Sequence, residues 1–274
     1  MLKLLQITDC HLLPPGGRIF DSDPAQRLAA AIADINRQHA DAALCVLTGD
    51  IAHDGDGPAY ELLRDLLAGL AVPWQLVPGN HDDKAAMRQV FPALTVDAEG
   101  FVQSVRDSPA GRLLFLDTVQ AGTHSGIYCP ARLRWLDRAL SEGARQPAYI
   151  FMHHPPMTIA MPRLDQYRLV DHQPLGELLD RHGTVRHIFF GHVHRPVSGS
   201  WRGIPFSAVP GTNHQNRLDF TAGRENISTL EPPAYAVIFL DAETTVVHLH
   251  GFMDDSPQFL YDPAAAPEAQ IRRL

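Results

Sequence analysis

The sequence predicts an α/β fold with a largely parallel or mixed sheet. Over roughly residues 1–200, short apolar runs typical of strands alternate with amphipathic stretches typical of helices. Blocks rich in His, Asp and Asn directly follow several of these apolar runs, as expected for functional loops at the ends of strands. From about residue 196 onward the chain becomes richer in strands, which predicts hairpins.

Each element is predicted by its own pattern. Apolar runs predict strands at residues 2–8, 43–48, 74–77, 101–106, 113–117, 148–152 and 185–190. Helical spacing predicts helices at residues 24–39, 58–70, 84–90, 132–142 and 174–181, the first with Asp23 as N-cap before Pro24. Paired runs predict one hairpin from residues 198–202 and 204–209, and a second from 234–240 and 245–251.

The length and composition are those of one large domain. A chain of 274 residues with 45% hydrophobic and 20% charged residues can bury a sizeable core and is not a disordered chain. We expect one domain over residues 1–262, with its core at 1–196 and C-terminal strands and a cap at 197–262. Residues 263–274 are rich in Ala and Pro and should form a loose tail.

The charge balance argues against polyanionic partners. Lys and Arg number 23 against 31 Asp and Glu, a net charge of −8, whereas nucleic acid polymers and anionic membranes require a basic face. No apolar stretch approaches the roughly 18 residues of a membrane span, and the N-terminal apolar run stops at Asp9, too early for a signal sequence. Three scattered cysteines suggest neither disulfides nor a thiolate metal site, so we expect a cytoplasmic protein.

Five short polar blocks contain the candidate chemistry. They are Asp9-Cys10-His11, Gly49-Asp50, Gly79-Asn80-His81-Asp82, His153-His154 and Gly191-His192-Val193-His194. Each follows a predicted strand, so all five should meet at the carboxyl edge of the sheet. Their carboxylates, amide and imidazoles are too many for one metal ion, which needs about four ligands, and fit two ions that share a carboxylate. Nitrogen and oxygen ligands without thiolate suit Mn, Fe, Co or Zn.

The five blocks, in this order, resemble the pattern of the calcineurin-like metallophosphoesterase superfamily: D-x-H, G-D, G-N-H-D/E, H and G-H-x-H. Residues 79–84, 152–156 and 210–215 are similar to its bacterial branch of glycerophosphodiesterases and class III cyclic-nucleotide phosphodiesterases. The resemblance implies a four-layer α/β/β/α sandwich of two mixed sheets with a strand-rich C-terminal cap segment. In that fold, residues 196–252 should complete the second sheet.

The resemblance also implies a role for each motif residue. The first metal would be bound by Asp9, His11, Asp50 and His194. The second would be bound by Asp50, Asn80, His153 and His192, with Asp50 as the bridging ligand. Catalytic roles would belong to His81, Asn80 and Asp50, with His81 steadying or protonating the phosphate, and substrate contacts to His81, Asn80 and His214.

The activity implied is hydrolysis of small phosphodiesters, of the glycerophosphodiester or 3′,5′-cyclic nucleotide type, by attack of a metal-bridging hydroxide. The cofactors would be two divalent metal ions (Mn, Fe, Zn or Co). A homo-oligomer is expected, with residues 212–233 as a candidate subunit contact. Three alternatives stay open: a phosphomonoesterase or nucleotide pyrophosphatase on the same fold, a nuclease, and a non-catalytic interaction module. The acidic net charge speaks against the nuclease.

Several other side chains near these blocks are expected to have no role in the site. His154 should face away from it, because neighbouring residues on a strand point to opposite faces. His53 and His124 should be solvated loop residues, Cys10 should point into the core, and His187 should be a surface or capping residue.

Overall fold

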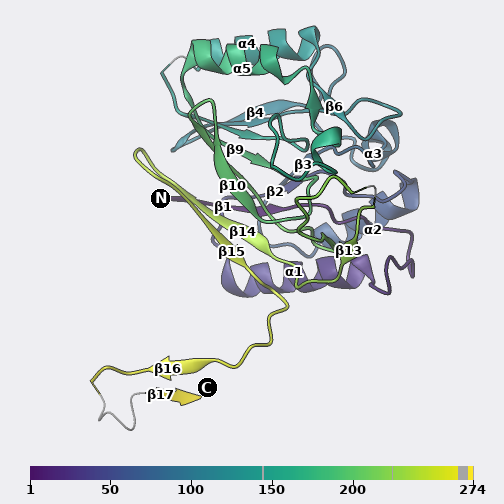
Figure 1. Cartoon of the computed structure of the whole chain (residues 1–274), viewed down its shortest axis with the longest axis vertical. Coiled ribbons are helices and arrows are strands. Elements are labelled where there is room, and N and C mark those ends of the chain that lie inside the picture. The colour runs from purple at the N-terminus through teal and green to yellow at the C-terminus, as the bar shows by residue number, and fades with distance from the viewer. Residues whose placement is uncertain (144, 224, 265–270, 274) are drawn as a thin grey trace.

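The computed structural model describes residues 1–143, 145–223, 225–264 and 271–273. In this part of the chain two sheets lie face to face between two groups of helices (Figure 1). One apolar cluster fills the space between the sheets, and two more fill the spaces between each sheet and its helices. The predicted four-layer α/β/β/α sandwich is therefore confirmed.

The first sheet combines strands from both ends of the chain. Its five strands lie in the order β15 (Thr245–His250), β14 (Tyr235–Leu240), β1 (Leu2–Ile7), β2 (Leu44–Thr48) and β3 (Trp74–Val77). β1, β2 and β3 are parallel, and β14 is antiparallel to β1. β2 is buried along its whole length, as expected for a Leu- and Val-rich strand that is covered on both faces.

The second sheet is formed by the middle of the chain. Its six strands lie in the order β10 (Val197–Trp201), β11 (Ile204–Ala208), β9 (Val185–Phe190), β7 (Ala148–Phe151), β5 (Gly111–Phe115) and β4 (Ser104–Ser108). The four central strands are parallel, and the edge strands β10 and β4 are antiparallel to their neighbours. The parallel strands of both sheets bring their carboxyl ends to one side of the molecule.

In the part of the chain that the structure describes, five α-helices cover the outer faces. α1 (Pro24–Gln38), α2 (Gly57–Leu67) and α3 (Lys84–Val90) pack on the first sheet, and α4 (Pro130–Glu142) and α5 (His172–His182) pack on the second. Asp23, Asp56 and Asp83 cap α1, α2 and α3 through hydrogen bonds from backbone N–H groups of the first turn. Shorter elements are η1 (Asp165–Tyr167) and the strand pairs β6 (Gly126–Ile127) with β8 (Leu169–Val170), and β12 (Gln215–Asn216) with β13 (Ser228–Thr229).

The strand arrangement differs from the sequence predictions in three respects. The hairpin of β14 and β15 pairs with β1 in the first sheet, so only β10 and β11 complete the second sheet. β4 begins at Ser104 and not at residue 101, because the backbone N–H of Val102 is bound to the Asp117 carboxylate instead of a strand partner. The short strand pairs were not predicted, since two-residue strands carry no periodic signal.

The predicted tail at residues 263–274 lies mostly outside the described residues. Of this stretch, β17 (Ile271–Arg273) pairs antiparallel with β16 (Phe259–Tyr261). In the described residues, no helix combines the length and the apolar character that crossing a membrane would require.

His187 on β9 is buried, which contradicts its predicted place at the surface. Only 7% of it is exposed, its Nε2 lies 2.9 Å from Ser207 Oγ, and its ring stacks on Phe189. The prediction was wrong because β9 is an internal strand of the second sheet with cover on both faces.

This buried imidazole should make the fold sensitive to acid. Burial lowers the pKa of His187 to about 4, below the ordinary value of 6.5 that applies in the unfolded chain. As the pH falls through this window the unfolded chain takes up a proton first, which costs up to about 3 kcal/mol of folding free energy. We expect metal-free His187→Gln to lose less stability than the metal-free wild type between neutral pH and about pH 4 in urea unfolding. If the free energies of unfolding of the two proteins fell by the same amount over this pH range, the expectation would be contradicted.

Candidate metal centre

The five polar blocks lie at the carboxyl ends of strands from both sheets. Asp9, Asp50 and Asn80 follow β1, β2 and β3, whereas His153 and His192 follow β7 and β9. Direct contacts join the two groups, since the backbone N–H of His192 lies 3.2 and 3.1 Å from the two carboxylate oxygens of Asp9. Blocks that are distant in the sequence thereby form one centre.

Four of the predicted ligands form a compact group. The ligand atoms of Asp9, His11, Asp50 and His194 all lie within 4.8 Å of one another, and all four residues are buried. The Nε2 atoms of His11 and His194 are 3.1 Å apart. Each also faces a carboxylate: His11 Nε2 lies 3.7 Å from Asp50 Oδ2, and His194 Nε2 lies 3.4 Å from Asp9 Oδ1. The structure thus brings together all the residues predicted for the first metal.

Of the residues predicted for the second metal, His153 faces the other oxygen of Asp50, and Asn80 and His192 lie next to His153. His153 Nε2 is 3.3 Å from Asp50 Oδ1 and 3.1 Å from Asn80 Oδ1. The rings of His153 and His192 are neighbours, with centroids 5.0 Å apart. His192 Nε2 is buried and has no hydrogen-bond partner within the described ranges. Asp50 therefore presents Oδ2 to His11 and Oδ1 to His153, an arrangement that a shared carboxylate ligand can have.

Backbone carbonyls fix the tautomers of two of these imidazoles. His153 Nδ1 donates to the carbonyl oxygen of Thr48 at 2.7 Å, and His194 Nδ1 donates to that of His214 at 2.9 Å. A neutral ring that carries its proton on Nδ1 presents the Nε2 lone pair to the centre. Histidine metal ligands are commonly held in this way.

The chemistry of the donor set fits bound cations. Asp9 and Asp50 are almost fully buried, and among the described residues only histidines form ion pairs with them. Burial raises the pKa of the Asp9 carboxyl and lowers the pKa of the His11 imidazole well below its usual range. Buried carboxylates and facing imidazole nitrogens are costly without a partner, and a cation between them would compensate both.

The carboxylate of Asp82 ties together the loops that follow β2 and β3. It accepts hydrogen bonds from the backbone N–H groups of Ile51, Ala52 and Gly79 and from the hydroxyl of Tyr60. Burial, with the nearby charge of Asp50, raises the pKa of Asp82 to about 6. Because one buried side chain holds both loops, the spacing between Asp50 and Asn80 is fixed.

The backbone is strained where it presents the candidate ligands. Eleven non-glycine residues in the described part of the chain have a positive φ. Five of them are candidate ligands: Asp9, His11, Asp50, His192 and His194. Such strain costs about 1–3 kcal/mol per residue and persists mainly where function requires the geometry.

Gly79 is required for the close approach of the loops after β2 and β3. A Cβ at this position would collide with the backbone N and the Oδ1 of Asp50 and would lie 2.9 Å from His153 Cε1. We expect Gly79→Ala to destabilise the protein by about 1–3 kcal/mol in urea unfolding and to weaken metal binding. Gly57→Ala is the matched control, because a Cβ there would meet no atom within 4 Å. Equal stability of the two variants would contradict this role.

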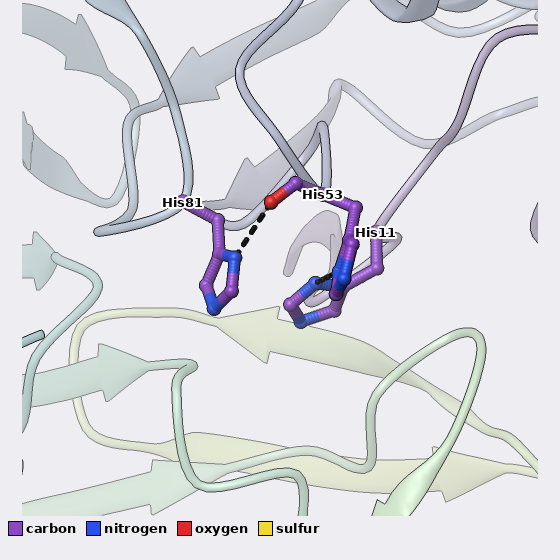
Figure 2. Close-up of side chains that lie close together, drawn as sticks. All are labelled: His11, His53 and His81. Carbon is purple, nitrogen blue, oxygen red and sulfur yellow. Dashed lines mark hydrogen bonds between the residues drawn. The ribbon is translucent and has the colours of Figure 1, made fainter. Parts of the chain in front are cut away.

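Asn80 and His81 line a cavity of about 490 Å³. The backbone N–H of His81 donates to Asp50 Oδ1 at 2.8 Å, and its Nδ1 lies 2.7 Å from the carbonyl oxygen of His53 (Figure 2). The cavity is also lined by Lys84 and Arg88 and by loop residues 119, 121 and 122. A phosphate ester in this cavity would contact His81 and Asn80 directly.

Three histidines that were expected to have no role lie beside candidate ligands, although His124 is exposed, as expected of a solvated loop residue. His53 Nδ1 is 3.1 Å from His11 Nδ1, and His124 Nδ1 is 3.1 Å from Asn80 Nδ2. His154 is fully buried, with its ring centroid 4.8 Å from that of His192. The strand-alternation argument failed for His154 because β7 ends at residue 151. The position of His53, three residues after Asp50 in the same loop, was the signal available in the sequence.

Two further expectations concern residues beside the ligands. His214 is near the centre, with its ring centroid 5.0 Å from that of His11 and 4.4 Å from that of His194. Cys10 is buried within the apolar cluster between the first sheet and its helices, as expected.

Comparison with known proteins agrees with this geometry. The model of the calcineurin-like phosphoesterase family matches residues 2–196. A probable cyclic nucleotide phosphodiesterase of Rhodopseudomonas palustris is 42% identical over 96% of this chain and 98% of its own length. Glycerophosphodiester phosphodiesterase GpdQ of Enterobacter lignolyticus is 29% identical over 99% of both chains. A 3′,5′-cyclic adenosine monophosphate phosphodiesterase, CpdA of Vibrio vulnificus, is 29% identical over 77% of this chain and 76% of its own length.

Solved structures share the fold at low sequence identity. A dimetal phosphatase from Danio rerio superposes with a TM-score of 0.70 at 17% identity, covering 92% of this chain and 97% of that structure. A purple acid phosphatase from yellow lupin superposes with a TM-score of 0.65 at 14% identity, covering 93% of this chain and 52% of that one.

A four-layer sandwich with a buried Asp–His centre at its strand ends defines a metal-dependent phosphoesterase. The chain belongs to the calcineurin-like phosphoesterase family. The resemblance to this superfamily, and to its bacterial branch, is thereby confirmed.

Proposed function

We propose that this chain is a dinuclear-metal-dependent phosphodiesterase that hydrolyses glycerophosphodiesters or 3′,5′-cyclic nucleotides. The observation that carries the proposal is the position of Asp50, whose Oδ2 faces His11 and whose Oδ1 faces His153. The substrate range is supported by the relatives, which are named for cyclic nucleotide and glycerophosphodiester hydrolysis.

The ligand sets follow from the two groups. The first cation would be held by Asp9, His11, Asp50 and His194, and the second by Asp50, Asn80, His153 and His192. Mixed imidazole and carboxylate ligands suit Mn, Fe, Zn or Co. Bound divalent cations would supply positive charge to the phosphate and lower the pKa of a coordinated water.

The side chains of the protein would position the ester and move protons. Asn80 and His81 border the cavity, so they would fix the phosphate in line for displacement. Because His81 Nδ1 is engaged by the carbonyl of His53, only Nε2 can exchange a proton with substrate. A His81 protonated on Nε2 would donate that proton to the leaving alkoxide.

The test compares diesters and monoesters under defined metal loading. Mn-loaded protein should hydrolyse bis(p-nitrophenyl) phosphate faster than p-nitrophenyl phosphate, and chelation should abolish both rates. Readdition of Mn should restore them, and 3′,5′-cyclic AMP and a glycerophosphodiester should then be compared as natural substrates. Loaded protein that leaves the diester intact, or prefers the monoester, would refute a phosphodiesterase.

Three further features belong to this proposal. We propose a homo-oligomer with residues 212–233 at the contact, a cytoplasmic location, and a cap formed within residues 197–262. The exposed apolar side chains of Leu218, Phe220 and Leu230 support the contact. Light scattering measures the oligomeric state, and a monomer at all concentrations would refute that part.

A further inference from the structure

His53 contacts both a candidate metal ligand and the candidate acid, through two different parts of one residue (Figure 2). Its imidazole Nδ1 lies 3.1 Å from His11 Nδ1, and its carbonyl oxygen accepts a hydrogen bond from His81 Nδ1 at 2.7 Å. Its ring also stacks on that of His81, with centroids 5.2 Å apart and planes 20° apart. His53 is therefore placed to orient two rings at once.

The hydrogen bond between His53 and His11 takes one direction when His11 binds a cation through Nε2. His11 Nε2 faces His194 Nε2 and the Asp50 carboxylate, so Nε2 is the nitrogen available to a cation. A neutral imidazole that ligates through Nε2 keeps its proton on Nδ1. His11 Nδ1 must then donate, and His53 Nδ1 must accept with its own proton on Nε2.

The backbone around His53 is held firmly. The N–H of His53 donates to the carbonyl oxygen of Leu12 at 2.8 Å, beside the bridge between Leu12 and Ala52. The N–H groups of the two preceding residues, Ile51 and Ala52, are bound by Asp82. The side chain of His53 is half-buried, and its ring contacts those of His11 and His81.

We propose that His53 is a positioning residue for the first metal site, where its imidazole fixes the tautomer and the orientation of His11. The backbone carbonyl of His53 orients His81 in the same way. Every variant with a different side chain at position 53 keeps this carbonyl. This inference rests on the proposed function, because it takes His11 as a metal ligand. Residues that hold a histidine ligand in this manner typically contribute 10–100-fold, as an order of magnitude, to metal affinity.

Two substitutions at His53 separate hydrogen bonding from bulk. His53→Asn places an amide oxygen near the position of Nδ1 and so retains a hydrogen-bond acceptor. His53→Leu retains a side chain of similar size but has no acceptor. Co titrations of the metal-depleted protein, followed by calorimetry and by the visible absorption of bound Co, should resolve two sites. His53→Leu should weaken one site by about 10–100-fold and leave the other unchanged, while His53→Asn should stay within a few-fold of wild type. His248→Leu, at an exposed position on β15, controls for loss of an imidazole.

The possible outcomes distinguish the two proposals. Wild-type affinity at both sites in His53→Leu, or equal losses in His53→Asn and His53→Leu, would overturn the positioning role alone. A third equivalent of Co that binds the wild type and is lost in His53→Leu would also overturn it, by making His53 a ligand. A wild-type protein that binds no Co would refute the proposed function itself.

Should His53→Leu fail to fold, the wild type provides an independent test. In Zn-loaded protein, a long-range proton–nitrogen NMR spectrum should show His53 protonated on Nε2 and unprotonated on Nδ1. The opposite tautomer would overturn the proposal, because His53 could then accept no hydrogen bond from His11.

Discussion

Asp50→Asn should remove both metals and reduce turnover to a small fraction of the wild-type rate. The two oxygens of Asp50 face His11 on one side and His153 on the other, and a neutral amide cannot supply charge to two cations at once. Since two cations contribute several kcal/mol to stabilising the transition state, we expect turnover to fall by at least about 10³-fold. Metal content and the rate on bis(p-nitrophenyl) phosphate are the two measurements.

Asp34→Asn is the control for Asp50→Asn. Asp34 is also buried, but it accepts hydrogen bonds from Tyr235, Gln38 and His250 at the interface of α1 with β14 and β15. This variant should retain both metals and its activity, even where it unfolds more readily. If Asp50→Asn kept two metals and a rate within tenfold of wild type, Asp50 would not be the shared ligand.

His81→Gln should leave metal content unchanged and slow the reaction in a way that depends on the leaving group. A proton from His81 is needed most when the departing oxygen is a basic alkoxide, and general acids contribute about 10²–10⁴-fold. We therefore expect losses of this size for alkyl diesters and much smaller losses for p-nitrophenyl esters, which leave without a proton.

Comparison of leaving groups provides the internal control for His81. Equal losses for alkyl and p-nitrophenyl esters would mean that His81 binds the phosphate and does not protonate the leaving group. Loss of a metal in His81→Gln would instead show that the imidazole ring supports the centre. The variant keeps the backbone N–H that donates to Asp50, so the loss could not come from that hydrogen bond.

The sequence predicted most of the fold because its signals are local. The Asp23 cap before α1, and the apolar runs of β1, β2 and β9, depend only on residues a few positions apart. The sheet that receives β14 and β15 was predicted wrongly, because register with β1 depends on a strand more than two hundred residues away. No local pattern encodes such a pairing.

The metal-ligand candidates were predictable for a related reason. Asp9, Asp50 and Asn80 each follow an apolar strand, and parallel strands bring their carboxyl ends to one edge. The side chains that surround the ligands were less predictable. His53, His124 and His154 were expected to have no role, and each lies against a ligand.

The sequence alone determined the chemistry of this protein: which donor atoms it has, in which order, and that they fall at strand ends. Only the tertiary structure decided which nitrogen of each imidazole faces the centre and which residues hold it there, as His53 holds His11. The physical reason is that donor type is a property of one residue. The direction of a lone pair is set by hydrogen bonds to groups from other strands, such as the carbonyl of Thr48 beside His153.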